Sequence, residues 1–199
     1  MGQEVSSGPA SSSPEAEVRL RAIAYLGKNG TRLPLALLRE KLGAATAGIE
    51  ALLATAGEAE ARQRPGMGRW CVQEIVDHLI ESHRPAIPQL AAAISGDDPG
   101  AAIPAHLLSA EPLASSYAQK LAELGEVHRG LDAIFEGAPE DAGATRKIPI
   151  AMVLKLPDGR LLEWQEALDF KAYLQGLRVH TLEHQAQVER TLAAIRGVA

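Results

Sequence analysis

The chain has 199 residues, of which 46% are apolar, and it carries a formal net charge of -5 and a single cysteine, Cys71. A chain of this length and composition can bury one core, and an acidic balance without a basic stripe argues against nucleic acid as a partner. The single cysteine excludes an intrachain disulfide framework, and no apolar stretch approaches the length of a membrane span. We therefore expect a soluble, cytoplasmic protein with no membrane partner.

The start of the chain differs in composition from the rest. Residues 1–14 are mainly serine, glycine and proline with little to bury, so we expect them to be a disordered leader. Residues 15–199 are expected to form a single domain that begins with a short helix over Glu15–Leu26. Aromatic residues make up only 4% of the chain and alanine is abundant, which favours closely spaced helices and an all-α fold.

Two long apolar patterns with helical spacing follow. Over residues 35–56 apolar side chains recur at alternating spacings of three and four, which predicts one long helix. After a polar loop, a second such pattern covers residues 72–94, but Pro85 and Pro88 lie inside it. A proline inside a helix removes a hydrogen bond and clashes with the preceding turn, so we expect a kink near residues 81–88.

The second half of the chain predicts two more helices and a short segment of strand. A third helix is expected to be capped near Ser109 and to run to Phe135. Alternating apolar residues over 148–156, followed by turn residues, favour a small hairpin or ordered loop. The last helix should run from about Trp164 to Ile195. Four helices with apolar faces are buried most economically as a four-helix bundle, with crossover connections where the intervening segments are long.

Three histidines suggest a metal site. His180 and His184 are four residues apart, so they lie one turn above each other on one helix face, and the apolar seam of that helix passes through His184. His78 lies at the border of the apolar face of the second helix. A histidine pair at this spacing is common and usually faces solvent or makes a local hydrogen bond. Together with a third imidazole from another helix, however, it would form a three-nitrogen site for a metal ion.

The sequence around these histidines resembles the DinB/YfiT-like superfamily of four-helix metalloproteins. The run GRWCVQEIVDHL over residues 68–79, followed by Glu81-Ser82-His83, is similar to the second helix of that family, and HTLEH over residues 180–184 matches the His-x-x-x-His of its last helix. The likeness spans roughly residues 33–196. It implies a divalent metal ion, zinc or nickel, held by His78, His180 and His184, with open coordination positions, and it implies a homodimer.

The resemblance also implies two kinds of enzyme. Some relatives are metal-dependent hydrolases, and others transfer a low-molecular-weight thiol such as bacillithiol, mycothiol or glutathione. We therefore expect a small-molecule substrate and, for a transferase, a thiol partner. The alternative is a non-catalytic metal-binding stress or scaffold protein. Because the ligands would be neutral imidazoles, metal occupancy is expected to fall as the pH drops through about 6.5.

Three residues near the histidines have two interpretations each. Cys71 stands where the family has a capping Ser or Thr, and it is either a small buried apolar residue or a thiolate whose pKa is lowered by the helix N-terminus. Glu74 could reach back to the backbone donors at the start of the helix. Glu74 and Glu183 could also orient a ligand imidazole through its second nitrogen, or they could simply face solvent.

The remaining candidates were weighed by their place on the helices. His83 lies five residues beyond His78, a rotation of about 140° on a helix, so it cannot readily share the same ion and is at most a pocket residue. His128 is interpreted as a hydrogen-bonded core histidine and His106 as a loop residue. Tyr173 is either a packed aromatic side chain or a hydroxyl donor in the same pocket.

Overall fold

The computed structural model describes residues 13–136, 138–143, 145–156 and 158–198. Most of the expected leader therefore lies outside the described residues. Its last residue, Pro14, is the first residue of helix α1 (Pro14–Leu26), and Ser13 caps this helix because its hydroxyl accepts a hydrogen bond from the N–H of Ala16. Within the described part of the chain, no helix combines the length and apolar character needed to cross a membrane.

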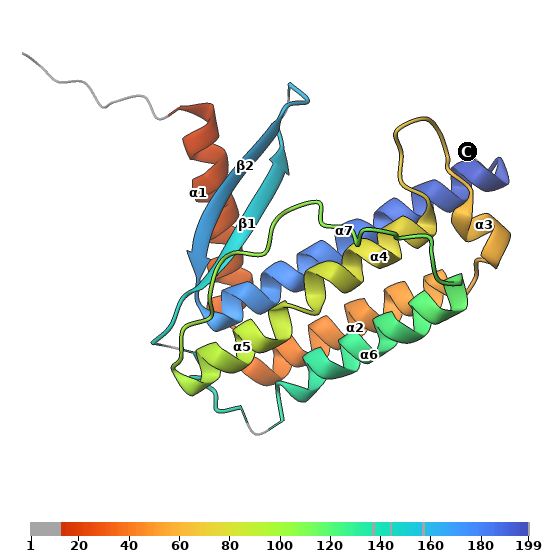
Figure 1. The fold of residues 1–199 in the computed structure, drawn as a ribbon. Helices are drawn as coiled ribbons and strands as arrows, with labels where there is room; N and C mark the ends of the chain where they lie inside the picture. The colour runs from red at the N-terminus through yellow and green to blue at the C-terminus, as the bar shows by residue number, and fades with distance from the viewer. Residues whose placement is uncertain (1–12, 137, 144, 157, 199) are drawn as a thin grey trace, which may run out of the picture.

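Four helices form the bundle (Figure 1): α2 (Leu35–Leu53), α4 (Val72–His83), α6 (Tyr117–Ala133) and α7 (Phe170–Arg196). Helix α2 packs against α6 and α7, and α4 packs against the same two helices. Helices α2 and α4 therefore occupy opposite corners although they follow each other in the chain, so the chain must cross the bundle between them. The predicted four-helix bundle with crossover connections is confirmed.

The predicted kink is a complete break between two helices. Helix α4 ends at His83, and α5 (Ala86–Ser95) begins directly after Pro85. Proline lacks a backbone N–H, so the hydrogen-bond ladder of α4 cannot continue through Pro85. Helix α5 ends at Gly96, which has a φ of 81° and so adopts the left-handed conformation that favours glycine at a helix end.

Two helix boundaries differ from the prediction. The first long helix ends at Leu53, and a short helix α3 (Glu58–Arg62) lies where the chain was expected to enter a loop. The third bundle helix begins at Tyr117 and not near Ser109. Its cap is Ser116, whose hydroxyl accepts from the N–H of Gln119, while the Gln119 side chain accepts from the N–H of Ser116. The expectation of a cap near Ser109 was wrong because this reciprocal capping box ends the preceding loop later in the chain.

The hairpin is confirmed and is longer than predicted. Strands β1 (Ile148–Lys155) and β2 (Leu161–Leu168) pair antiparallel, with Met152 opposite Trp164. The last helix therefore begins at Phe170, and the prediction that it starts at Trp164 was wrong. Asp169 sets the boundary because its carboxylate accepts from the N–H of Ala172 at 2.9 Å and so caps α7.

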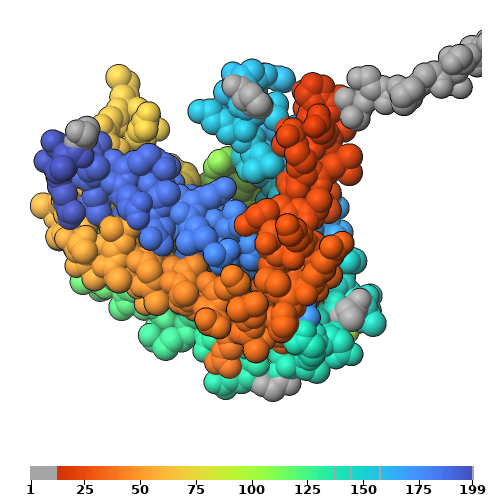
Figure 2. Space-filling view, turned by 180° about the vertical axis from the view of Figure 1, so that it is seen from behind, coloured from red at the N-terminus to blue at the C-terminus, as the bar shows by residue number. Residues whose placement is uncertain are grey.

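Helix α1 continues into a π-helical turn, η1 (Gly27–Thr31), which fixes it against the start of α7. A Cβ atom on Gly30 would lie 2.7 Å from the carbonyl oxygen of Lys171, so this close approach requires glycine. The hydroxyl of Thr31 donates to the Asp169 carboxylate at 2.6 Å. Figure 2 shows α1 standing at one end of the bundle with the hairpin beside it. The hairpin lies against the first half of α7, where Ile150 approaches Gly176.

A polar layer separates two apolar clusters in the core. The buried apolar residues of α7 up to Leu177 belong to the cluster near α5 and the hairpin, and those from Val188 onward belong to the cluster near α3. His180 and His184 lie between the two, at the same level as His78 of α4 and His128 of α6. With His83 of α4, whose ring lies between those of His128 and His180, the bundle places five histidines in the layer where neither apolar cluster fills the core.

Candidate metal centre

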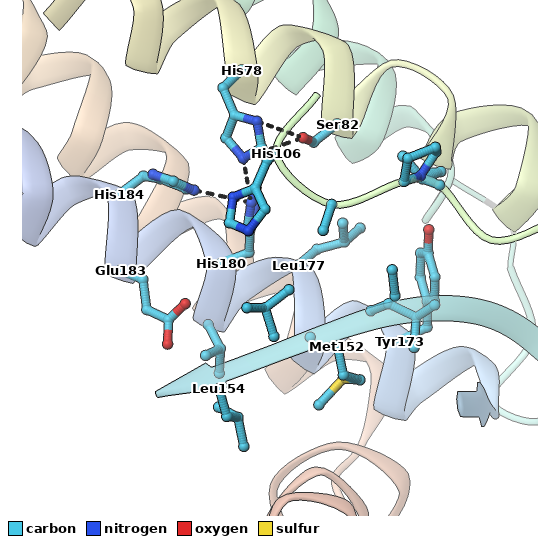
Figure 3. Close-up of a pocket in the computed structure, with 18 of the residues that line it drawn as sticks. His78, Ser82, His106, Met152, Leu154, Tyr173, Leu177, His180, Glu183 and His184 are labelled. Carbon is cyan, nitrogen blue, oxygen red and sulfur yellow. Dashed lines mark hydrogen bonds between the residues drawn. The ribbon is translucent and has the colours of Figure 1, made fainter. Parts of the chain in front are cut away.

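Three histidine side chains converge on one point from two helices (Figure 3). Nε2 of His180 lies 3.0 Å from Nε2 of His78 on α4 and 3.1 Å from Nε2 of His184, one turn further along α7. The candidate ligand atoms of all three residues lie within 4.8 Å of one another. Nitrogen ligands at about 2.0–2.1 Å from a tetrahedral zinc ion would be about 3.3 Å apart. In this set of three residues, here called the histidine cup, the two distances from Nε2 of His180 are close to that value.

Each ring of the histidine cup is held by its other nitrogen. Nδ1 of His78 lies 2.7 Å from the backbone oxygen of Leu107, and Nδ1 of His184 lies 2.8 Å from Oε1 of Gln187. Carbonyl and amide oxygens only accept hydrogen bonds, so both Nδ1 atoms carry the hydrogen. Burial lowers the pKa of His78 and lowers that of His184 to about 4, so both rings are neutral near pH 7. Their Nε2 atoms therefore have free lone pairs.

The number of hydrogens available to the three Nε2 atoms tests whether a metal ion fits the site. Two bare Nε2 atoms face Nε2 of His180, and the three rings together supply at most one hydrogen to this point, apart from the Ser82 hydroxyl at 3.5 Å from Nε2 of His78. Burial also lowers the pKa of His180 well below its usual value, so protonation does not supply a further donor near pH 7. Converging lone pairs with few donors are an arrangement that a cation satisfies. The residues present fit a divalent ion, and their role as its ligands remains a prediction.

A buried network behind the histidine cup holds the backbone that contacts His78. The carboxylate of Asp77 accepts from the backbone N–H and the hydroxyl of Ser109, each at 2.8 Å, and from Nζ of Lys120 at 2.6 Å. Although burial alone would raise it, these bonds hold the pKa of Asp77 below its usual value. The network fixes the loop before α6, and this loop supplies the Leu107 oxygen that orients His78.

His83 contacts the histidine cup from behind. It is fully buried, and its Nε2 lies 3.2 Å from Nδ1 of His180. It is turned away from the point where the three Nε2 atoms meet, as the helical spacing predicted, but sequence reasoning missed its contact with His180. Beyond it, Nδ1 of His128 lies 2.5 Å from a carboxylate oxygen of Glu50, so the interpretation of His128 as a hydrogen-bonded core histidine is confirmed.

The acidic residues and the cysteine beside the cup have other roles. Glu74 accepts from the N–H of Cys71 at 2.8 Å and pairs with Arg64, so it caps α4. Among the described residues, the second nitrogens of the cup are bound by groups other than Glu74 and Glu183. Cys71 is buried, and burial raises the pKa of its thiol. It is a small buried apolar residue, and the reactive-thiolate interpretation was wrong.

A cavity of about 290 Å³ opens above the cup, between α7, β1 and the loop over residues 103–106. Figure 3 shows the histidines at one end and Tyr173 at the other. The Tyr173 hydroxyl donates to Oε1 of Gln89 at 2.8 Å, so this side chain is a packed aromatic wall. His106 is the expected loop residue, but it also lines the cavity, and its φ of 57° is uncommon for a non-glycine residue. Ser82 lies beside His78, with its Oγ 3.5 Å from Nε2.

Several groups of the site could not be named from sequence. Leu107 acts through its backbone oxygen, which any residue provides, so no sequence signal marks it. Gln187 follows His184 by three residues on the same helix, a spacing at which side chains meet, so its role could have been inferred. The wall formed by β1 depends on how the hairpin folds onto α7, and helical periodicity says nothing about that contact.

The arrangement of the helices and the histidine cup together define a four-helix bundle protein with a cluster of three histidines at a cavity. No protein-family model matches the sequence, and no curated protein matches it. Among solved structures, the chain is similar to YfiT from Bacillus subtilis, described as a probable metal-dependent hydrolase with an unusual four-helix bundle topology. That match has a TM-score of 0.55 and 16% identity and covers 96% of this chain and 94% of YfiT.

The chain is also similar to the mycothiol-dependent maleylpyruvate isomerase. The TM-score is 0.57 at 13% identity, over 83% of this chain and 68% of the isomerase, and a mutant of the isomerase gives the same coverage at 12% identity. Likeness at such identities establishes the fold. The DinB/YfiT-like fold implied by the sequence resemblance is therefore confirmed.

Proposed function

We propose that the protein is a metal-dependent enzyme that acts on small molecules, with His78, His180 and His184 as the ligands of one divalent ion. The observation that carries this proposal is the histidine cup itself. Its Nε2 atoms converge at the end of a cavity, and each Nδ1 has a partner that fixes the orientation of the ring. An ion on three imidazoles keeps open coordination positions and acts there as a Lewis acid.

Within this proposal, the chain's own residues bind and orient the substrate. The aliphatic walls exclude water, which strengthens polar interactions at the histidine end. The Ser82 hydroxyl, beside His78, is available to hydrogen-bond a substrate oxygen. His83 and the Leu107 oxygen keep the rings of His180 and His78 from rotating, so the three nitrogens stay aimed at one point.

Hydrolysis is the reaction that we favour. YfiT, described as a probable metal-dependent hydrolase, matches over nearly the whole length of both chains, whereas about a third of the isomerase lies outside its match. Transfer of a low-molecular-weight thiol is the second candidate. It is favoured by the name of the mycothiol-dependent neighbour and by the exposed rim at His106 and Glu183, through which a second molecule could approach. Zinc and nickel are the metals that we propose, because imidazole nitrogens suit both.

The proposal is tested with protein purified without an affinity tag. We expect about one zinc or nickel ion per chain by elemental analysis and turnover in a panel of small esters, amides and thiol-electrophile pairs. In His78→Ala both should be lost, whereas His128→Gln, which changes a buried histidine outside the cup, should keep both. Turnover that persists in metal-free His78→Ala would refute the proposal of a metal-dependent enzyme. Stoichiometric metal without turnover would favour the alternative of a non-catalytic metal-binding protein.

A further inference from the structure

The walls of the cavity carry very few charged side chains. Among the described residues that line it, none is a lysine or an arginine, and Glu183 is the only carboxylate. Side chains along β1 and α7 provide an aliphatic surface that includes Ile150, Met152, Leu154 and Leu177. The polar groups gather at the histidine end. The cavity therefore offers polar chemistry at one end and an uncharged surface along the rest of its length.

Arginines near the hairpin are engaged outside the cavity. The guanidinium of Arg19 lies 5.5 Å from the ring centroid of Trp164. Arg160 donates to Asp158 at 2.7 Å and to Glu15 at 3.4 Å. These contacts hold both arginines on surfaces that do not line the cavity. An anion bound along β1 would therefore not meet either guanidinium there.

The cost of an anionic group in this cavity follows from its surroundings. A carboxylate carried along β1 would lose hydration, and no cationic side chain of the wall would compensate for that loss. The Glu183 carboxylate at the histidine end would add repulsion. An ion in the histidine cup would carry two positive charges, which one anionic group bound to it and the Glu183 carboxylate would balance, so a second anionic group several ångströms away would meet little net attraction.

We propose that the substrate has one polar reacting group, which lies at the histidine cup, and an uncharged apolar body, which lies along β1 and α7. This inference rests on the proposed function and adds the substrate class. The volume of about 290 Å³ holds roughly ten non-hydrogen atoms if each takes about the volume of a water molecule, so it limits the part of the substrate that lies inside the cavity. Compounds with a second anionic group on that body are excluded as good substrates.

A pair of matched ligands tests the inference. Benzohydroxamate and 4-carboxybenzohydroxamate present the same metal-binding group and the same ring, and they differ by one carboxylate on the body. Titration calorimetry with the zinc-loaded protein should give a dissociation constant at least tenfold larger for the carboxylated compound. Equal or tighter binding of that compound would overturn the substrate class and leave the proposed function standing. If neither compound binds, the metal-anchored site fails, and the substrate class fails with it.

A pair of variants on β1 tests whether the cavity wall itself causes the difference in binding. Met152 lines the cavity, so Met152→Lys places a cation beside the body of the ligand, while Met152→Gln is the neutral polar control. We expect the lysine variant to bind 4-carboxybenzohydroxamate at least tenfold more tightly than the glutamine variant does. No difference between the two would overturn the inference. Leu154→Lys and Leu154→Gln provide the same comparison at the next cavity-lining position on that face of β1, should circular dichroism show that the Met152 variants do not fold.

Discussion

Asp77 and His78 are neighbours on α4 and both are buried, yet they belong to opposite kinds of polar cluster. The Asp77 carboxylate accepts three hydrogen bonds, two from Ser109 and one from Lys120, and its charge is paired. The Nε2 atom of His78 faces two other ring nitrogens, and the three rings supply at most one hydrogen to the point where they meet. One cluster is fully paired within the protein, and the other presents lone pairs to a cavity.

The difference separates a structural polar cluster from a binding site. A closed network stabilises the fold because every buried charge and donor has its partner. Converging lone pairs with too few donors do not stabilise the fold. The free energy lost by burying them is regained when a cation binds. Substitutions at Asp77 should therefore act mainly on stability, and substitutions in the histidine cup should act mainly on metal affinity.

The largest effect is expected for Asp77→Asn. Loss of the carboxylate charge leaves the mostly buried Lys120 ammonium with only the more exposed Glu123 carboxylate, at 3.5 Å, as counter-ion, which should lower the free energy of unfolding by about 3 kcal/mol. Urea denaturation of the metal-free protein measures this change. Asp132→Asn, which breaks the exposed pair with Arg39, is the control and should cost less than about 1 kcal/mol. A similar loss in both variants would contradict the structural role of the closed network.

His180→Ala should have the largest effect on metal binding. It removes the ligand that lies between the other two, so zinc affinity should fall by more than the roughly 100-fold that loss of an outer partner can cause. Competition with a chromophoric chelator gives the dissociation constants. Its stability without metal should change less than that of Asp77→Asn. If His180→Ala bound zinc with wild-type affinity, the distinction between the Asp77 network and the histidine cup would be wrong.

A smaller loss is expected for His83→Phe. The phenyl ring fills the buried space but cannot hydrogen-bond Nδ1 of His180, so zinc affinity should fall by roughly 10–100-fold. His83→Gln, which keeps a polar group at this position, should recover part of that loss. In the cobalt-loaded protein, the visible absorption bands should shift in the phenylalanine variant. Unchanged bands and affinity would show that His83 only fills space.

The pH dependence of stability gives an effect that is small per pH unit and accumulates as the pH falls. Burial holds the pKa values of His78, His180 and His184 below the reference value of about 6.5, so below that pH the unfolded chain binds more protons than the native state. The metal-free protein should therefore lose stability as the pH falls from about 6.5 toward 4, by up to about 1.4 kcal/mol per pH unit for each histidine. Denaturation at a series of pH values measures this slope, and His184→Gln should reduce it. A flat profile would contradict the burial of neutral rings.

The same pKa shifts refine the expected pH dependence of metal occupancy. From reference values alone, occupancy was expected to fall through about pH 6.5. In the folded protein, burial favours the neutral rings that bind metal, so proton competition should begin at a lower pH. Dialysis at stepped pH followed by elemental analysis tests this, and a midpoint at or above 6.5 would contradict it.

Periodicity predicted the bundle well because the core is built from regular helix faces. The seam of α2 and the break at Pro85 follow from side-chain spacing and from proline chemistry, both local properties. Errors arose where a local signal competed with another one. Ser109 is a good cap residue in isolation, but its hydroxyl and N–H bind Asp77, and Ser116 caps the helix instead.

The three histidines of the candidate site were predictable from the sequence, and their surroundings were not. Spacing and the family resemblance selected the three histidines, which the structure brings together. The groups that hold their second nitrogens come from a backbone carbonyl, a neighbouring turn and a buried histidine on the far side of His180. These contacts, like the uncharged wall of β1, depend on how distant segments pack, and a single sequence does not specify that packing.

X-ray absorption spectroscopy of the zinc-loaded protein tests the central claim most directly. The account predicts a zinc shell with three imidazole nitrogens at about 2.0–2.1 Å, identified by the outer-shell scattering of the rings, and a shell with fewer imidazoles in His180→Ala. A sulfur ligand from Cys71, or a shell of oxygen atoms without imidazole, would contradict the assignment of His78, His180 and His184 as the metal site.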